Sequence, residues 1–169
     1  MPEKRRAMTP ESVKSKNLSL DMNKFRQIEI EAPIKRFKNK RVLVIDDDIY
    51  SVQILLHVLQ QFGCNVQVSQ NAINAVDRLV KDDFDLIILD WMMPKLNGNE
   101  TLLAAQQLIG GVDEYGPLGR HTPFIVYSGL PKDRLDVPYC SHFDYLKHLQ
   151  KPQRYANLKR EIFSLLYSL

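Results

Sequence analysis

The sequence predicts an α/β fold, in which a doubly wound parallel sheet of five strands has the strand order 2-1-3-4-5. Two observations lead to this prediction. Short runs rich in β-branched residues alternate along the chain with segments whose apolar residues recur at helical spacing. The runs at residues 42–45 and 86–89 are apolar at every position, which is typical of strands that helices cover on both faces.

Three strand–helix units follow one another in the first part of this domain. Their strands are expected over residues 41–46, 65–69 and 84–90. The apolar positions at helical spacing are Val52, Leu55, Leu56, Leu59 and Phe62 after the first strand, Ala72, Ala75, Val76, Leu79 and Val80 after the second, and Leu102, Leu103 and Ile109 after the third. Gly63 is expected to end the first helix, and the third helix is expected to start near Gly98.

The second half of the chain is less regular. Residues 110–122 hold four of the seven glycines and are expected to form a long loop. The last two strands are expected over residues 124–128 and 145–150. The segment 131–143 between them should hold a helix, but Pro138 interrupts it and predicts a short, broken or loosely packed one. Pro152 is expected in the first turn of the last helix.

Charge divides the chain into a basic N-terminal arm or linker, residues 1–40, and a domain over residues 41–169. The arm holds 11 Lys and Arg against 5 Asp and Glu, a net charge of +6, whereas the domain holds 12 against 15, a net charge of −3. We expect the arm to be partly disordered. Its cations are spread among acids with few aromatic residues, which favours a solvated or partner-binding tail over nucleic-acid binding.

Membrane and secretion signals are not found in the sequence. No apolar run approaches the roughly 18 residues that a membrane span needs, and the charged N-terminus lacks the apolar core of a signal peptide. We therefore expect a cytoplasmic protein. Cys64 and Cys140 have no CxxC or metal-ligand spacing, which favours buried or incidental thiols.

Two of the predicted strands end in acidic residues. Asp46 and Asp47 end the first strand, and Asp90 ends the third. The predicted strand order places these strands side by side at the switch point of the sheet, where ligands of open α/β folds bind. Clustered carboxylates repel one another unless a cation or proton offsets their charge. Hard oxygen ligands of this kind suit Mg²⁺, with Mn²⁺ as an alternative.

Two further side chains suit a site that handles phosphate. Ser128 ends the fourth strand and offers a hydroxyl, and Lys151 ends the fifth strand and offers a mobile ammonium. A plainer reading is that Asp47 or Asp48 only caps the helix that follows the first strand. The combination of acids, hydroxyl and ammonium at successive strand ends favours the phosphate site.

Residues 41–169 resemble the receiver domain of bacterial two-component response regulators, which has a flavodoxin-like fold. The resemblance rests on residues 42–48, 89–94 with Gly98, 127–129 and 149–152. It implies that Asp90 accepts a phosphoryl group from a phosphohistidine of a histidine kinase or a histidine phosphotransfer protein. It also implies that Mg²⁺ is held by Asp47, Asp90 and the backbone carbonyl of Met92, with Asp46 acting mainly through a bound water. Lys151 and Ser128 would contact the phosphoryl oxygens.

The resemblance also implies a switch made of Ser128 and an aromatic residue in the fifth strand. This sequence has His148 at the aromatic position, which is a departure from the family pattern. Met92 and Leu130 flank the site and are apolar, so they cannot easily orient a hydrolytic water. We therefore expect slow autodephosphorylation, and no enzymatic activity beyond this and the self-catalysed phosphotransfer.

Three readings of function remain open from the sequence. The first is a phosphoaccepting receiver that switches the binding of an unknown downstream protein, either as a stand-alone receiver or as a piece of a hybrid kinase. The second is a pseudo-receiver that serves as an interaction module without phosphorylation. The third, a phosphohydrolase of the haloacid dehalogenase type, is disfavoured because Tyr50 replaces the expected Thr or Val.

Overall fold

The computed structural model describes residues 37–110 and 121–169. In these residues, five strands form one sheet in the order β2-β1-β3-β4-β5. Every neighbouring pair is parallel. The predicted fold class and strand order are therefore confirmed.

The elements alternate along the chain as expected. The strands are β1 (Arg41–Ile45), β2 (Asn65–Ser69), β3 (Leu86–Leu89), β4 (Thr122–Ser128) and β5 (Phe143–Gln150). The helices are α2 (Ile49–Gln61), α3 (Ala72–Lys81), α4 (Gly98–Ile109) and α5 (Tyr155–Ser168), with a 3-10 turn, η1 (Lys132–Arg134), between β4 and β5.

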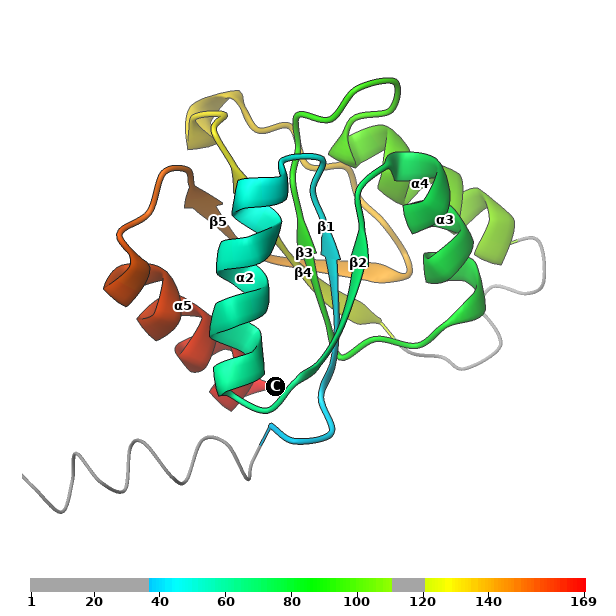
Figure 1. Ribbon diagram of the computed structural model, residues 1–169. Coiled ribbons are helices and arrows are strands. Elements are labelled where there is room, and N and C mark those ends of the chain that lie inside the picture. The colour runs from blue at the N-terminus through cyan, green and yellow to red at the C-terminus, as the bar shows by residue number, and fades with distance from the viewer. Residues whose placement is uncertain (1–36, 111–120) are drawn as a thin grey trace, which may run out of the picture.

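Helices cover the sheet on both faces, and each face has its own apolar core. Figure 1 shows α2 and α5 on one side of the sheet and α3 and α4 on the other. The first core includes Val42, Val44, Leu55, Leu59, Tyr127, Leu149, Leu158 and Ile162, and the second includes Leu43, Ile45, Ala75, Leu79, Ile87, Leu102, Phe124 and Val126. Alternate residues of β1 therefore face opposite cores, as the continuously apolar strand pattern predicted.

Side chains in the connecting loops begin the helices. Asp48 caps α2, Asn71 caps α3 and Asn97 caps α4, each accepting hydrogen bonds from backbone N–H groups of the first turn. At α4 the Glu100 side chain bonds back to the Asn97 backbone and completes a capping box. Gly63 follows α2 with φ 77°, a conformation that favours glycine, as its predicted role as helix stop requires.

The connection between β4 and β5 differs from the prediction. The expected short or broken helix over residues 131–143 is only the 3-10 turn η1, closed by the N–H groups of Arg134 and Leu135. Pro131 and Pro138 lack a backbone N–H and restrict φ, so a regular helix cannot span them. Leu130, Leu135 and Val137 still pack against the second core.

The last helix also starts later than predicted. Pro152 was expected in its first turn, but α5 begins at Tyr155. The first helical acceptor is the carbonyl of Arg154, which takes hydrogen bonds from the N–H groups of Asn157 and Leu158. Pro152 therefore belongs to the turn that joins β5 to α5.

Two predictions fall largely outside the described residues. These are the partial disorder of the basic arm, of which 1–36 are not described, and the glycine-rich loop, of which 111–120 are not described. The domain boundary at Arg41 stays a prediction. Phe37, on the N-terminal side of that boundary, is only 1% exposed and packs edge-on against Phe62 and Phe163, with ring centroids 6.1 and 5.8 Å away.

Among the described residues, the helices are all too short or too polar to cross a membrane.

The aromatic packing of Phe37 predicts a stability effect. Phe37→Ala should lower the free energy of unfolding by about 3–5 kcal/mol, because it removes a fully buried ring and leaves a cavity between α2 and α5. Urea unfolding of the full chain measures this. Tyr139→Ala, at an 89% exposed aromatic residue, is the control and should change stability by less than about 0.5 kcal/mol. A loss below about 1 kcal/mol for Phe37→Ala would contradict the role of this residue in the core.

Candidate functional site

The acidic residues lie where two neighbouring parallel strands end. Asp46 directly follows β1 and Asp90 directly follows β3. The backbone ladder continues through both positions, because the Asp46 N–H donates to the Ser69 carbonyl at 3.1 Å and the Asp90 N–H to the Ile45 carbonyl at 2.8 Å. The two carboxylates are thus held by sheet pairing at a fixed separation.

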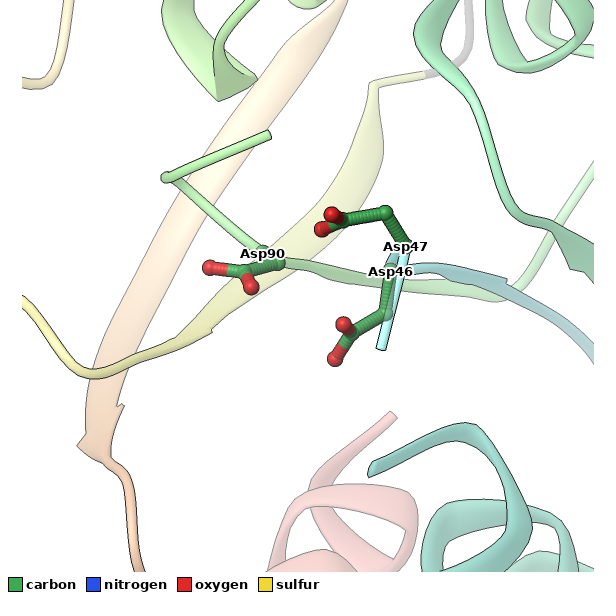
Figure 2. A group of neighbouring side chains, drawn as sticks. All are labelled: Asp46, Asp47 and Asp90. Atoms are coloured by element: carbon green, nitrogen blue, oxygen red, sulfur yellow. The ribbon is translucent and has the colours of Figure 1, made fainter. Parts of the chain in front are cut away.

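Three carboxylates converge at this edge. Asp46, Asp47 and Asp90 each offer an oxygen, and these oxygens lie within 4.8 Å of one another. Figure 2 shows the Asp46 and Asp47 side chains, from the end of β1, beside the Asp90 side chain. Asp46 and Asp90 are buried, at 1% and 7% exposure, whereas Asp47 is exposed and opens the cluster to solvent.

Lys151 directly follows the edge strand β5, and its side chain reaches the two buried acids. Its ammonium donates to Asp46 Oδ2 at 2.7 Å and to Asp90 Oδ2 at 2.8 Å. The Lys151 backbone N–H donates to the Ser128 carbonyl at 2.8 Å, which places this residue just beyond the β4–β5 pairing. The predicted partners Asp46, Asp90 and Lys151, which are 105 and 61 residues apart in sequence, are therefore in direct contact.

Burial and charge shift the ionisation of this group in opposite ways. Burial raises the pKa of Asp46, and the hydrogen bond and charge of Lys151 only partly offset that effect. Burial alone would lower the pKa of Lys151, but the hydrogen bonds and charges of Asp46 and Asp90 outweigh it, so the pKa of Lys151 is raised. Lys151 therefore stays protonated and is the cation that makes two buried acids tolerable.

The donor set fits a small divalent cation. Three carboxylates and one ammonium leave a formal charge of −2, and an exposed acid gives access from solvent. Octahedral Mg²⁺ places ligand oxygens about 3 Å apart when adjacent and about 4.2 Å apart when opposite. The separation of at most 4.8 Å between the three oxygens requires only small side-chain movements to meet this geometry.

Backbone N–H groups orient the acids further. The Asp48 N–H donates to Asp46 Oδ1 and the Met92 N–H donates to Asp90 Oδ1, both at 3.0 Å. Asp48 uses its own side chain to cap α2, so it has the structural role that the plainer reading gave it, and Asp47 is left free for the cluster. The predicted contact of the Met92 carbonyl with a metal stays a prediction.

A tight turn after Asp90 shapes one wall of the site. The Gly98 N–H donates to the Trp91 carbonyl at 3.1 Å, and a Cβ on Gly98 would lie 2.7 Å from the Trp91 ring. Glycine is therefore required for this close approach. Trp91 is buried, whereas the side chain of the next residue, Met92, is 61% exposed.

The predicted switch residues lie beside the cluster rather than in it. Ser128 is fully buried, and its Oγ accepts a long hydrogen bond of 3.4 Å from the Leu130 N–H. His148 lies on β5 opposite Val126, and in the described part of the chain its buried Nε2 has no hydrogen-bond partner. Their roles in switching stay predictions.

One contact at the site was missed by sequence reasoning. The Lys151 ammonium lies over the Tyr127 ring, 5.2 Å from its centroid. Tyr127 reads in the sequence as an ordinary apolar strand residue. Only the β4–β5 register, which brings it opposite Leu149, could have indicated its nearness to Lys151.

Comparison with known proteins identifies the family. The sequence pattern described as "Response regulator receiver domain" matches residues 42–162. The chain is 30% identical over 105 residues to transcription factor SKN7 of Saccharomyces cerevisiae, which covers 62% of this chain and 15% of that protein. It is 42% identical over 67 residues to the transcriptional regulatory protein CpxR of Escherichia coli, covering 40% of this chain and 28% of that protein. The chain thus spans less than a third of these relatives.

A solved structure gives the same fold. The receiver domain of the sensor histidine kinase PA1611 from Pseudomonas aeruginosa, with a magnesium ion in its active-site cleft, matches with a TM-score of 0.57 at 23% identity. The match covers 78% of this chain and 99% of that one. With the family pattern extending over most of the chain, from β1 into α5, the protein belongs to the response regulator receiver domain family of two-component signalling.

Proposed function

We propose that this protein is a phosphoaccepting receiver, in which Asp90 takes a phosphoryl group from a phosphohistidine and thereby changes the binding of a downstream partner. The observation that carries the proposal is the convergence of Asp90 with Asp46, Asp47 and the Lys151 ammonium at one edge of the sheet. The family supports a histidine kinase or a histidine phosphotransfer protein as the donor.

In the proposed reaction, a carboxylate oxygen of Asp90 attacks the phosphorus of the phosphohistidine. The O–P bond forms as the N–P bond breaks, and the electron pair of that bond stays on the imidazole nitrogen. Bound Mg²⁺ supplies neutralisation of the phosphoryl charge, and Asp46, Asp47, Asp90 and the Met92 carbonyl would hold it. The chain catalyses its own modification and turns over no separate substrate.

Lys151 and Ser128 would contact the transferred group. Lys151 already lies 2.8 Å from Asp90 Oδ2, so its ammonium needs only a small movement to meet a phosphoryl oxygen on the same carboxylate. Ser128 ends the neighbouring strand, and its weak bond from Leu130 is easily exchanged for a stronger one to phosphate. The phosphoryl group adds roughly −1.5 to −2 units of charge, which is the driving force for both movements.

A second candidate function is a pseudo-receiver that binds partners without phosphorylation. Two observations favour it: the β4–β5 connection has only the turn η1 where a helix was expected, and His148 replaces the aromatic switch residue. The complete acidic cluster opposes it. Equal partner binding by wild type and Asp90→Ala would support the pseudo-receiver.

Phosphorylation is predicted to require Asp90. Incubation of the chain with acetyl phosphate and Mg²⁺ should add one phosphoryl group by mass spectrometry, and Asp90→Asn should abolish this addition because the amide is not a nucleophile of comparable strength. Asp85→Asn, at the opposite end of β3, is the control and should be phosphorylated like wild type. An unmodified wild type, or equal modification of Asp90→Asn, would contradict the proposal.

Metal binding is predicted to depend on the exposed acid. Asp47→Asn should weaken Mg²⁺ binding by about tenfold or more, because it removes one charged ligand from the cluster. The fluorescence of Trp91, the single tryptophan of the chain, reports binding from the position next to Asp90. Asp77→Asn, an exposed acid of α3, should leave the affinity unchanged. Equal affinities for Asp47→Asn and wild type would exclude Asp47 as a ligand.

The phosphoryl group is predicted to be long-lived because of Met92. Its backbone N–H bonds to Asp90, and its side chain is exposed and cannot hydrogen-bond a water strongly. Met92→Asn should speed the decay of the phosphorylated form about tenfold, the effect of one well-placed hydrogen bond in the transition state. Met92→Leu is the apolar control and should decay like wild type. An unchanged decay rate in Met92→Asn contradicts the explanation.

A further inference from the structure

Tyr127 offers an uncommon surface to the ammonium of Lys151. Its side chain belongs to the core between the sheet and helices α2 and α5, and it is only 4% exposed. The Lys151 Nζ lies over the ring, 5.2 Å from the centroid, which is within the range of about 6 Å for a cation–π contact. The ring face is electron-rich and attracts the cation.

The contact completes the surroundings of the ammonium. A lysine ammonium has three N–H donors. Two of them bond to Asp46 Oδ2 and Asp90 Oδ2. The Lys151 side chain is 17% exposed, so solvent has limited access, and the Tyr127 ring provides a third favourable contact.

The position of the ring follows from strand register. Tyr127 pairs with Leu149 and Ser128 pairs with Gln150, so Lys151 is the first residue beyond the paired part of β5. Alternation along β4 puts Tyr127 and Ser128 on opposite faces of the sheet. The hydrogen bond from the Lys151 N–H to the Ser128 carbonyl, at 2.8 Å, then fixes the Lys151 backbone close to Tyr127.

We infer that Tyr127 is a positioning residue for the phosphotransfer, holding the Lys151 ammonium at the site through its ring face. The inference rests on the proposed function, because it concerns the lysine that meets the phosphoryl group. When a divalent cation and the phosphoryl group engage Asp46 and Asp90, the lysine loses part of its hold on these carboxylates. Its four-carbon stem is flexible. The ring is the contact that the metal does not compete for, and it keeps the ammonium from turning to solvent.

The test separates the ring face from the hydroxyl and from general packing. In the full chain, Tyr127→Leu removes the ring, whereas Tyr127→Phe keeps it. The initial rate of phosphorylation by acetyl phosphate at saturating Mg²⁺ should fall about 3- to 10-fold in Tyr127→Leu and stay within about twofold of wild type in Tyr127→Phe. The Mg²⁺ affinity, followed by Trp91 fluorescence, should change less than about twofold in both, because the lysine acts on the phosphoryl group.

Two controls make the result specific. Phe124→Leu alters a buried aromatic of the same strand that faces the other core, and it should lower stability without slowing phosphorylation. Tyr127→Met also lacks the ring and replaces Tyr127→Leu if that variant does not fold. A wild-type rate in the ring-less variant overturns the inference. It is also overturned if Tyr127→Phe slows as much as Tyr127→Leu, or if Phe124→Leu slows equally.

The same assay distinguishes failure of the inference from failure of the proposed function. Lys151→Met should slow phosphorylation more than Tyr127→Leu does. If wild type is not phosphorylated, the proposed function fails and the inference fails with it. If wild type and Lys151→Met are phosphorylated equally, Lys151 does not assist the transfer, and the inference fails while Asp90 remains the phosphoacceptor. If Lys151→Met is slow and Tyr127→Leu is as fast as wild type, the inference alone is wrong.

Discussion

The bridge from the Lys151 ammonium to Asp46 and Asp90 is the interaction on which the rest of the site depends. Two buried carboxylates on neighbouring strands repel each other and lose hydration, which is why burial raises the pKa of Asp46. One shared ammonium offsets both effects at distances of 2.7 and 2.8 Å. The bridge also requires β5 to run parallel beside β4, since only then does its end reach the end of β1 and β3.

The bridge does not neutralise the site completely. With Asp47 included, the cluster keeps a formal charge of −2 near solvent, and a divalent cation would neutralise this excess. Backbone N–H groups of Asp48 and Met92 hold the remaining carboxylate oxygens at 3.0 Å. The acids are therefore oriented by the sheet, by two loops and by one lysine, so the proposed chemistry at Asp90 would need little reorganisation.

The half of the domain around β4 and β5 is built differently from the half around β1 and β3. The connection over residues 129–142 packs Leu130, Leu135 and Val137 on the second core without a regular helix. The register of the β4–β5 pairing shifts between Phe124 and Ile125, and β5 exposes Tyr145 and Leu146. Ser128 and His148 lie in this half. A movement of Ser128 toward a phosphoryl group would therefore displace backbone in the least regular part of the fold.

The sequence by itself determined the strands, most of the helices, the strand order and the positions of Asp46, Asp47, Asp90, Ser128 and Lys151 at strand ends. The strands and helices follow from local periodicity, and the strand order is one common solution for a doubly wound sheet. The grouping of the site residues follows from the rule that parallel strands end at one edge. Tertiary structure alone decided that Trp91 is buried, that Phe37 joins the core, that the 131–143 segment is not a helix and that Tyr127 lies under Lys151. Each of these depends on which side chains meet across strands and layers, and that is set by register, sheet twist and packing volume rather than by any pattern within one segment.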